Sequence, residues 1–173
     1  AMVKWATEYY VQPGVILKWV NHLQELKNSG DLSSDLWITT SDNFASYGGG
    51  SKDYHVEDLV KLMHAVDYIS MHTYPMHDTH YSPVFWGVLE SENNLSQKEK
   101  IDAAMRRAKD YAVSQYEGVK TYMKSLGINK PIHIGETGWA TRSGGHYGNT
   151  GSKATDEYKG ALFYKHMREW ANA

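Results

Sequence analysis

The 173-residue sequence contains no cysteine, which excludes disulfide bonds, thiol nucleophiles and thiolate metal sites. It has no apolar run close to the roughly 18 residues that a membrane-spanning helix needs. The formal net charge of -2 gives no general reason to expect nucleic acid or an anionic membrane as a partner. The first residues, AMVKW, show no signal-peptide pattern. With 41% hydrophobic and 22% charged residues, the composition is that of an ordinary globular domain.

Phenylalanine is also scarce, with 3 Phe against 13 Tyr and 6 Trp. Tyr and Trp combine a flat apolar face with a polar edge. Sugar rings pair apolar faces with hydroxyl rims, so this bias suits a carbohydrate-binding site. Ordinary packing in the core and at the surface would produce the same composition.

Helical and strand-like segments alternate along the chain. Apolar residues recur with helical spacing in four segments, 13–29, 56–66, 96–126 and about 155–173. Three short apolar, β-branched segments have the pattern of strands, at 36–40, 67–73 and 131–135. Strands separated by helices predict right-handed crossovers and a parallel sheet, which is an α/β fold.

Local signals place the ends and faces of these helices. Pro13 suits a first turn and Gly30 a helix end. The residues SQKE, 96–99, form a capping-box pattern at the start of the third helix. The first helix has one apolar stripe, and the last helix carries apolar residues along its length: Ile16, Trp19, Val20, Leu23 and Leu26, and Tyr158, Leu162 and Trp170.

The three predicted strands end in polar or aromatic residues where packing residues would be expected. These ends read TSDN (40–43), HTYP (72–75) and GETGW (135–139). In parallel sheets ligands bind at the C-terminal ends of the strands. The second end runs into a long, aromatic-rich connection, 75–95, and such connections in compact domains are often functional. We therefore expect a site at this edge of the sheet.

The segment HIGETGWA places Glu136 at that edge, where a carboxylate can act as acid, base or nucleophile. Gly135 and Gly138 carry no side chains, which would let a bulky substrate approach. Trp139 offers a face for stacking, and Tyr74 is placed to donate a hydrogen bond that keeps Glu136 ionised. The alternative is that Glu136 only ends a strand and pairs with a nearby Lys or Arg.

The segment IHIGETGWA resembles the signature of glycoside hydrolase family 17, the β-1,3-glucanases and related β-1,3-glucan transglycosylases. That pattern is an apolar strand, a small residue, Glu, a small residue, Gly, Trp and usually Pro, where this chain has Ala140. The resemblance continues through WITTSDNFASYGGG, DYISMHTYPMHDTHY and GSKATDEYKGALFYKHMREW, so it covers essentially the whole chain.

The resemblance implies a (β/α)8 TIM barrel, of which residues 1–173 would be a fragment of the single catalytic domain. About three parallel strands and four helices are predicted, which would correspond to roughly strands five to seven. The family's acid/base Glu lies in a sequence resembling Gly-Asn-Glu, which this chain lacks. Three strands cannot close a barrel, since about eight are needed. We therefore expect the missing barrel segments, or a second chain, to cover the exposed sheet edges.

The resemblance also implies a retaining hydrolase that acts on β-1,3-glucan by double displacement. Glu136 would be the nucleophile, Tyr74 would approach it as a second catalytic residue, and the acid/base Glu would lie upstream of this chain. A sugar acceptor in place of water would give transglycosylation instead. No cofactor and no metal is implied, and a glucan substrate implies secretion or export to the periplasm.

Eight further residues are candidates for substrate binding: Asp42, Asn43, Tyr47, His72, His77, Trp86, Trp139 and Lys153. Asp42 and Asn43 equally suit a turn. Tyr47 and Trp86 equally suit packing. Lys153 lies in a motif that resembles a family loop beside the nucleophile, and it equally suits a solvated surface.

Two interpretations from other classes stay open. Four residues of metal-ligand type lie close together in the chain: His72, His77, Asp78 and His80. TIM-barrel metallohydrolases exist, although this spacing has no H-E-x-x-H pattern. The other possibility is a non-catalytic glucan-binding module.

Overall fold

The computed structural model describes residues 12–48, 56–79, 82–141 and 156–173. The chain divides into two compact units, residues 1–72 with 115–135 and residues 73–114 with 136–173. No helix in the described ranges is both long and apolar enough to span a membrane.

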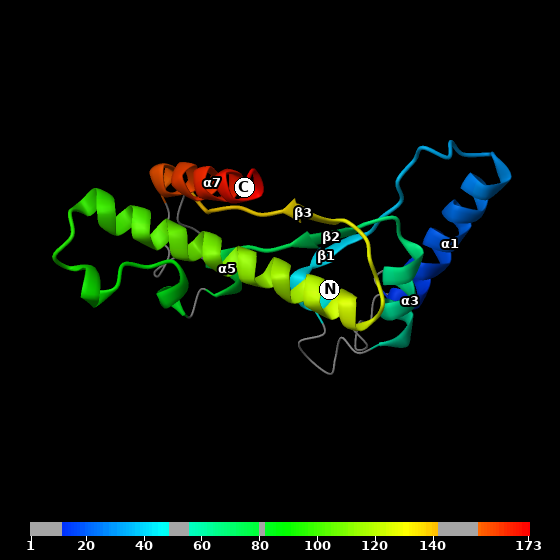
Figure 1. The fold of residues 1–173 in the computed structure, drawn as a ribbon, viewed down its shortest axis with the longest axis horizontal. Helices are drawn as coiled ribbons and strands as arrows, with labels where there is room; N and C mark the ends of the chain where they lie inside the picture. Colours follow the sequence, from blue (N-terminus) through cyan, green and yellow to red (C-terminus); the bar gives the residue numbers. More distant parts are fainter. Residues whose placement is uncertain (1–11, 49–55, 80–81, 142–155) are drawn as a thin grey trace. The chain divides into compact units, whose positions relative to one another are not determined.

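The first unit contains most of a parallel sheet. The described strands are β1 (Ser41–Asn43), β2 (Ile69–His72) and β3 (Ile132–Glu136), and they lie side by side in that order (Figure 1). β1 and β2 pair in parallel, with Ser41 opposite Ser70. Ile69 N donates to Pro131 O and Thr73 N donates to Glu136 O, so β3 runs in the same direction as β2. The predicted α/β architecture with three parallel strands is confirmed.

The helices of the first unit are α1 (Pro13–Ser29), α2 (Phe44–Gly48), α3 (Glu57–Ala65) and the C-terminal part of α5 (Gln97–Ser125). Their buried apolar side chains form one core with the sheet, including Val20, Tyr47, Leu59, Leu62, Met63, Ile69, Met71, Val119 and Met123. Each of the four predicted helices is present among the described elements. The short helices α2 and α4 were not predicted, because four or five residues are too few to show helical periodicity.

The first strand was predicted five residues too early, at 36–40. That segment lies beside the start of β2, but side chains rather than a backbone ladder hold much of it. The Asp67 carboxylate accepts a 2.6 Å hydrogen bond from Ile38 N, and Thr39 Oγ1 donates to Tyr68 O at 2.6 Å. Regular pairing begins only at Ser41.

The ends of α1 agree with prediction, with Pro13 in the first turn and Gly30 at the C-cap with a φ of 87°. Its predicted apolar stripe is wrong in part, because Trp19 is 63% exposed. The face that packs uses Val20 together with the polar Gln24, which donates to Ala65 O at 2.9 Å. The inner face of α1 is therefore partly polar, and apolar periodicity alone could not locate it.

The second unit contains α4 (Pro75–Asp78), two 3-10 turns at Pro83–Phe85 and Glu90–Glu92, the N-terminal part of α5, and α7 (Glu157–Ala171). The predicted capping box is present, since Ser96 N donates to Glu99 Oε2 at 2.9 Å and Glu99 N donates to Ser96 Oγ at 3.4 Å. The connection 75–95, predicted as a long loop, contains α4 and both turns.

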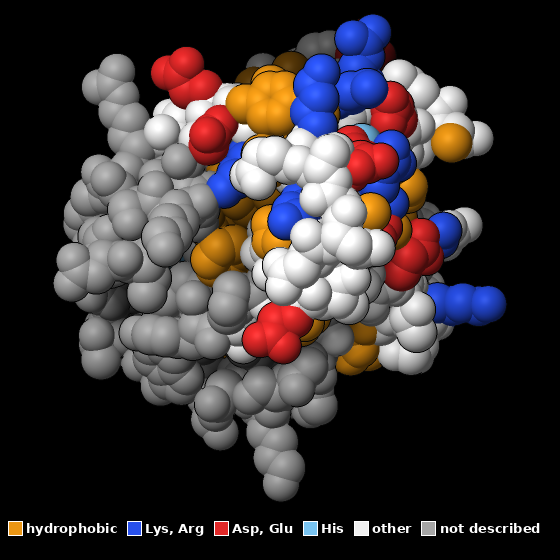
Figure 2. Space-filling model, turned by 90° about the vertical axis from the view of Figure 1, so that its left-hand side faces the viewer, with side chains coloured by type: hydrophobic (Ala, Val, Ile, Leu, Met, Phe, Trp, Pro, Cys, Tyr) orange, Lys and Arg blue, Asp and Glu red, His pale blue; other side chains and the backbone are white. Residues whose placement is uncertain are grey.

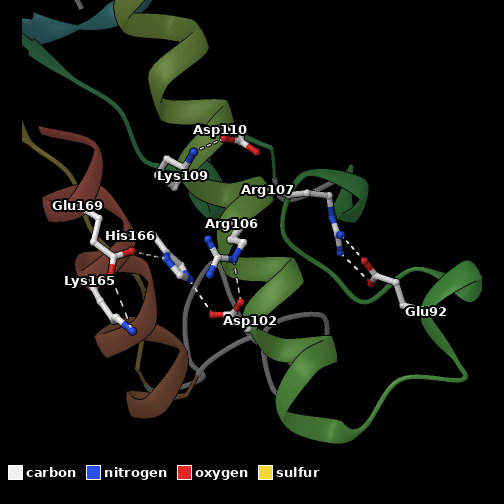
Figure 3. Close-up of polar contacts among 9 residues, drawn as sticks. All are labelled: Glu92, Asp102, Arg106, Arg107, Lys109, Asp110, Lys165, His166 and Glu169. Carbon is white, nitrogen blue, oxygen red and sulfur yellow. Dashed lines mark hydrogen bonds and ion pairs between the residues drawn. The ribbon is translucent and has the colours of Figure 1, made fainter. Parts of the chain in front are cut away.

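An ion pair fixes that connection to α5. The Arg107 guanidinium contacts both carboxylate oxygens of Glu92 (Figure 3). It also donates to Gly87 O at 2.6 Å. The hydrogen bond from Arg107 holds the pKa of Glu92 below its usual range. The face in Figure 2 shows acidic and basic side chains interspersed among the described residues, in keeping with the net charge of -2.

The buried face of α7 also differs from the apolar residues identified in its sequence. Its buried residues are Gly160, Phe163, His166 and Met167, whereas Tyr158 is exposed. A Cβ at Gly160 would lie 3.8 Å from the Cβ of Trp139, so the helix packs closely against the segment that follows β3. Those apolar residues could not locate the packed face, because a glycine and a histidine belong to it.

Candidate active site

Glu136 and Tyr74 meet at the C-terminal ends of β3 and β2. Thr73 N donates to Glu136 O at 3.0 Å, which extends the pairing one residue beyond β2. Pro75 opens α4 and has no N–H to donate, so the ladder stops at this point. The Tyr74 hydroxyl then donates a 2.8 Å hydrogen bond to Oε2 of Glu136. This predicted bond is confirmed, and it fixes the orientation of the carboxylate.

The two glycines beside Glu136 leave room for neighbouring side chains. A Cβ at Gly135 would lie 2.2 Å from Ser70 Oγ, far inside contact distance. A Cβ at Gly138 would lie 3.3 Å from the Tyr164 hydroxyl and 3.5 Å from Cε1 of Tyr74. The sequence suggested substrate access as the reason for these glycines, and the structure gives a different one, the close approach of protein atoms.

A pocket of about 270 Å³ lies within the second unit beside these residues. Its lining includes three aromatic side chains and a histidine: Tyr74, Met76, His77, Gly138, Trp139, Ala140 and Tyr164. Three of the predicted site residues, Tyr74, His77 and Trp139, therefore meet at one pocket. Tyr164, on α7, was missed, because nothing in the helical pattern distinguishes it from Tyr158, the other tyrosine of that helix.

Trp139 is packed rather than presented as an open face. It is 8% exposed, and its ring centroid lies 6.3 Å from that of Trp86 and 6.0 Å from that of Phe163. Trp86 is half-buried and its indole N–H donates to Thr79 O at 3.3 Å. Only a small part of the Trp139 indole can reach a ligand in this arrangement. The role of both tryptophans as sugar platforms stays a prediction.

Four predicted binding residues belong to the first unit: Asp42, Asn43, Tyr47 and His72. The Asp42 carboxylate accepts from Ser46 Oγ at 2.9 Å and from Asn43 N at 2.7 Å. Asn43 Oδ1 accepts from Ala45 N at 3.0 Å at the start of α2. Both residues thus stabilise this turn, as the alternative interpretation expected, and sugar binding by them stays a prediction.

Tyr47 belongs to the core. It is 1% exposed and its hydroxyl donates to Thr40 O at 3.0 Å. Burial, with the nearby Asp42 charge, raises the pKa of Tyr47. A sugar cannot reach this ring without movement of the core. His72 is the half-buried last residue of β2.

The metal hypothesis gains no support from the described side chains. Among them, no group of three or more His, Asp or Glu residues is arranged to hold a metal ion. His80 and Lys153 lie outside the described residues, and the Asp78 side chain is not described either.

No protein-family profile and no curated protein matches the chain. Among solved structures, the crystal structure of an endo-laminarinase from Formosa Hel1_33_131 is similar, with a TM-score of 0.90. The sequences are 72% identical, and the match covers 99% of this chain. The chain spans 44% of the length of that protein. The two therefore share the fold described here over nearly the whole of this chain.

Proposed function

We propose that this chain is part of a retaining glycoside hydrolase that cleaves β-1,3-glucan. The observation that carries the proposal is the 2.8 Å hydrogen bond between Tyr74 and Glu136 at the ends of two parallel strands. The endo-laminarinase with 72% identity supports β-1,3-glucan as the substrate class. We assign the chain to glycoside hydrolase family 17 on its IHIGETGWA segment.

The fold that fits this proposal is part of a (β/α)8 barrel. Three parallel strands connected through helices are the repeating unit of that barrel. The chain matches 44% of its structural neighbour, which is in keeping with a partial domain. Further barrel segments would then pair with the outer strands and supply the rest of the site.

The proposed reaction is double displacement. Glu136 attacks the anomeric carbon and the glycosidic bond breaks, while an acid/base Glu upstream of this chain protonates the leaving oxygen. The same Glu then removes a proton from water, which attacks the glycosyl-enzyme and releases Glu136. The two carboxylates would lie about 5 Å apart. Tyr74 would hold Glu136 in line for both steps. A polymeric substrate is in keeping with an enzyme that is secreted or exported to the periplasm.

Hydrolysis of laminarin by the full-length protein that carries this chain tests the proposal. We expect release of short β-1,3-linked oligosaccharides, no release from β-1,4-glucan, and loss of turnover in Glu136→Gln. Glu117→Gln, an exposed change on α5, is the matched control. In Glu136→Ala, azide should restore cleavage of an activated β-glucoside and give the α-glycosyl azide.

Different outcomes separate the alternatives. Full activity in Glu136→Gln would exclude Glu136 as the nucleophile. Products longer than the donor would assign transglycosylation. Loss of turnover with a chelator would revive the metallohydrolase, and glucan binding without turnover would favour a binding module.

A further inference from the structure

Tyr164 contacts the backbone that directly follows Glu136. Its hydroxyl donates a 3.2 Å hydrogen bond to Thr137 O. The two residues lie 27 positions apart, on α7 and just after β3. Tyr74 holds the Glu136 side chain at 2.8 Å, so two tyrosine hydroxyls bind consecutive residues. One of them fixes the carboxylate and the other fixes the main chain that carries it.

Tyr164 is also an exposed part of the pocket wall. Half of its surface, 51%, is exposed, although Phe163 next to it is fully buried. With Tyr74, Trp139 and His77 it lines the pocket of about 270 Å³. Gly138 lies close to Tyr164, because a Cβ at Gly138 would be 3.3 Å from the Tyr164 hydroxyl. An exposed aromatic ring on the pocket that Tyr74 also lines offers the apolar face that a sugar ring needs.

The position of Tyr164 is fixed by the residues around it on α7. His166 is buried, with Nε2 2.8 Å from Oδ1 of Asp102 on α5 and Nδ1 3.2 Å from Oε2 of Glu169 (Figure 3). Phe163 packs against Trp139 with ring centroids 6.0 Å apart. Anchors on both sides of residue 164 set the rotation and register of the helix, so Tyr164 does not depend on its own contact to stay in place.

We propose that Tyr164 is a positioning and substrate-binding residue of this site, an inference that rests on the function proposed above. Its hydroxyl positions the backbone at Thr137 and thereby Glu136. Its ring forms the wall against which a glucosyl ring of the β-1,3-glucan packs. The two roles belong to different parts of one side chain, so they can be separated by substitution.

The test measures kcat and KM on laminarin oligosaccharides for three variants in the full-length protein. Tyr164→Phe keeps the ring and removes the hydroxyl, so we expect kcat to fall about 3- to 10-fold while KM stays within about twofold. Tyr164→Ala removes both, and KM should also rise about 10-fold. Tyr164→Trp should restore KM but not kcat.

Tyr158→Phe and Tyr158→Ala are the matched controls, because Tyr158 is 44% exposed on the same helix and does not line the pocket. If the wild type is active and the Tyr164 variants have the same kcat and KM as the Tyr158 controls, the inference is overturned and the proposed function stands. If the wild type neither binds nor cleaves β-1,3-glucan, both fail. Should Tyr164→Ala not fold, Tyr164→Leu takes its place, because it keeps apolar bulk but removes the aromatic ring, and the same rise in KM is expected.

Discussion

The Tyr74 hydroxyl lies 2.8 Å from Oε2 of Glu136, although 62 positions separate the two residues in the chain. Parallel pairing of β2 and β3 brings them together, because both strands end at the same edge of the sheet. In the proposed reaction, the Tyr74 hydroxyl orients the Glu136 carboxylate for attack. The proposed reaction depends on this pair of residues.

Tyr74→Phe should lower kcat by roughly 10- to 100-fold, because Glu136 loses the hydroxyl that orients it and a nucleophile misplaced by about 1 Å can cost on the order of 100-fold in rate. The ring and its packing stay in place, so the melting temperature should change little. Steady-state kinetics on laminarin oligosaccharides, with Tyr158→Phe as the control, measure the effect. Equal kcat values for the two variants would show that the Tyr74 hydroxyl has no part in the reaction.

Gly135→Ala should destabilise the protein by about 1–3 kcal/mol, because the new Cβ would lie 2.2 Å from Ser70 Oγ. In a Ser70→Ala background the same change should cost less, since the clashing atom is gone. Gly118→Ala on α5, where a Cβ meets nothing within 4 Å, should instead stabilise by about 0.5–1 kcal/mol. Denaturant titration of Gly135→Ala, Ser70→Ala, their double variant and Gly118→Ala measures the free energy of unfolding of each. The first three give the coupling energy between positions 70 and 135. Additive effects at positions 70 and 135 would contradict the steric explanation.

Asp67 should make the folded protein less stable when the solution becomes acidic. Partial burial alone would raise its pKa, but hydrogen bonds from Ile38 N, Lys27 and Gln24 outweigh that effect and hold the pKa below its usual range. The ionised form is thus favoured in the folded state, so Asp67 stabilises above the unfolded-state pKa of about 3.9. This contribution to stability is lost as the pH falls through the lower pKa that Asp67 has in the folded state.

The difference in unfolding free energy between wild type and Asp67→Asn should therefore be large at pH 7 and shrink below about pH 4. Asp35→Asn, an exposed change in the loop after α1, should show no such trend. Denaturant midpoints between pH 7 and pH 2.5 measure both. A difference that stays constant over this range would contradict the role assigned to Asp67.

His166→Ala should destabilise the protein by about 2–4 kcal/mol at pH 7, because it removes a buried ring and two contacts to carboxylates. His22→Ala is the matched control, because His22 lies 3.9 Å from Glu25 on the exposed face of α1 and such pairs contribute little. Equal changes in the two denaturation midpoints would exclude the buried contacts as a source of stability.

Local sequence signals predicted the helices well, because a few adjacent residues determine where a helix is capped. As expected, Pro13 and Gly30 mark the two ends of α1, and the capping box of Ser96 and Glu99 lies at the start of α5. The first strand could not be placed, since three paired residues show no periodicity and the side chain of Asp67 holds the segment before them.

The site was predictable to the extent that topology determines it. Strand ends in a parallel sheet lie together, so Tyr74 and Glu136 could be paired from the sequence. Tyr164 could not, because which tyrosine of α7 reaches the pocket depends on the rotation of that helix. That rotation is set by Phe163 and His166, whose burial the apolar pattern did not reveal.

The most direct measurement of the central claim is intact-mass analysis after incubation with an activated 2-deoxy-2-fluoro-β-laminaribiosyl donor. Its good leaving group reduces the need for the acid/base residue, so the first displacement can be observed alone. We predict one added glycosyl unit on the full-length protein, located at Glu136 by peptide mapping and absent from Glu136→Gln. A folded, full-length protein that acquires no label, or acquires it at another residue, would contradict the assignment of Glu136 as the nucleophile.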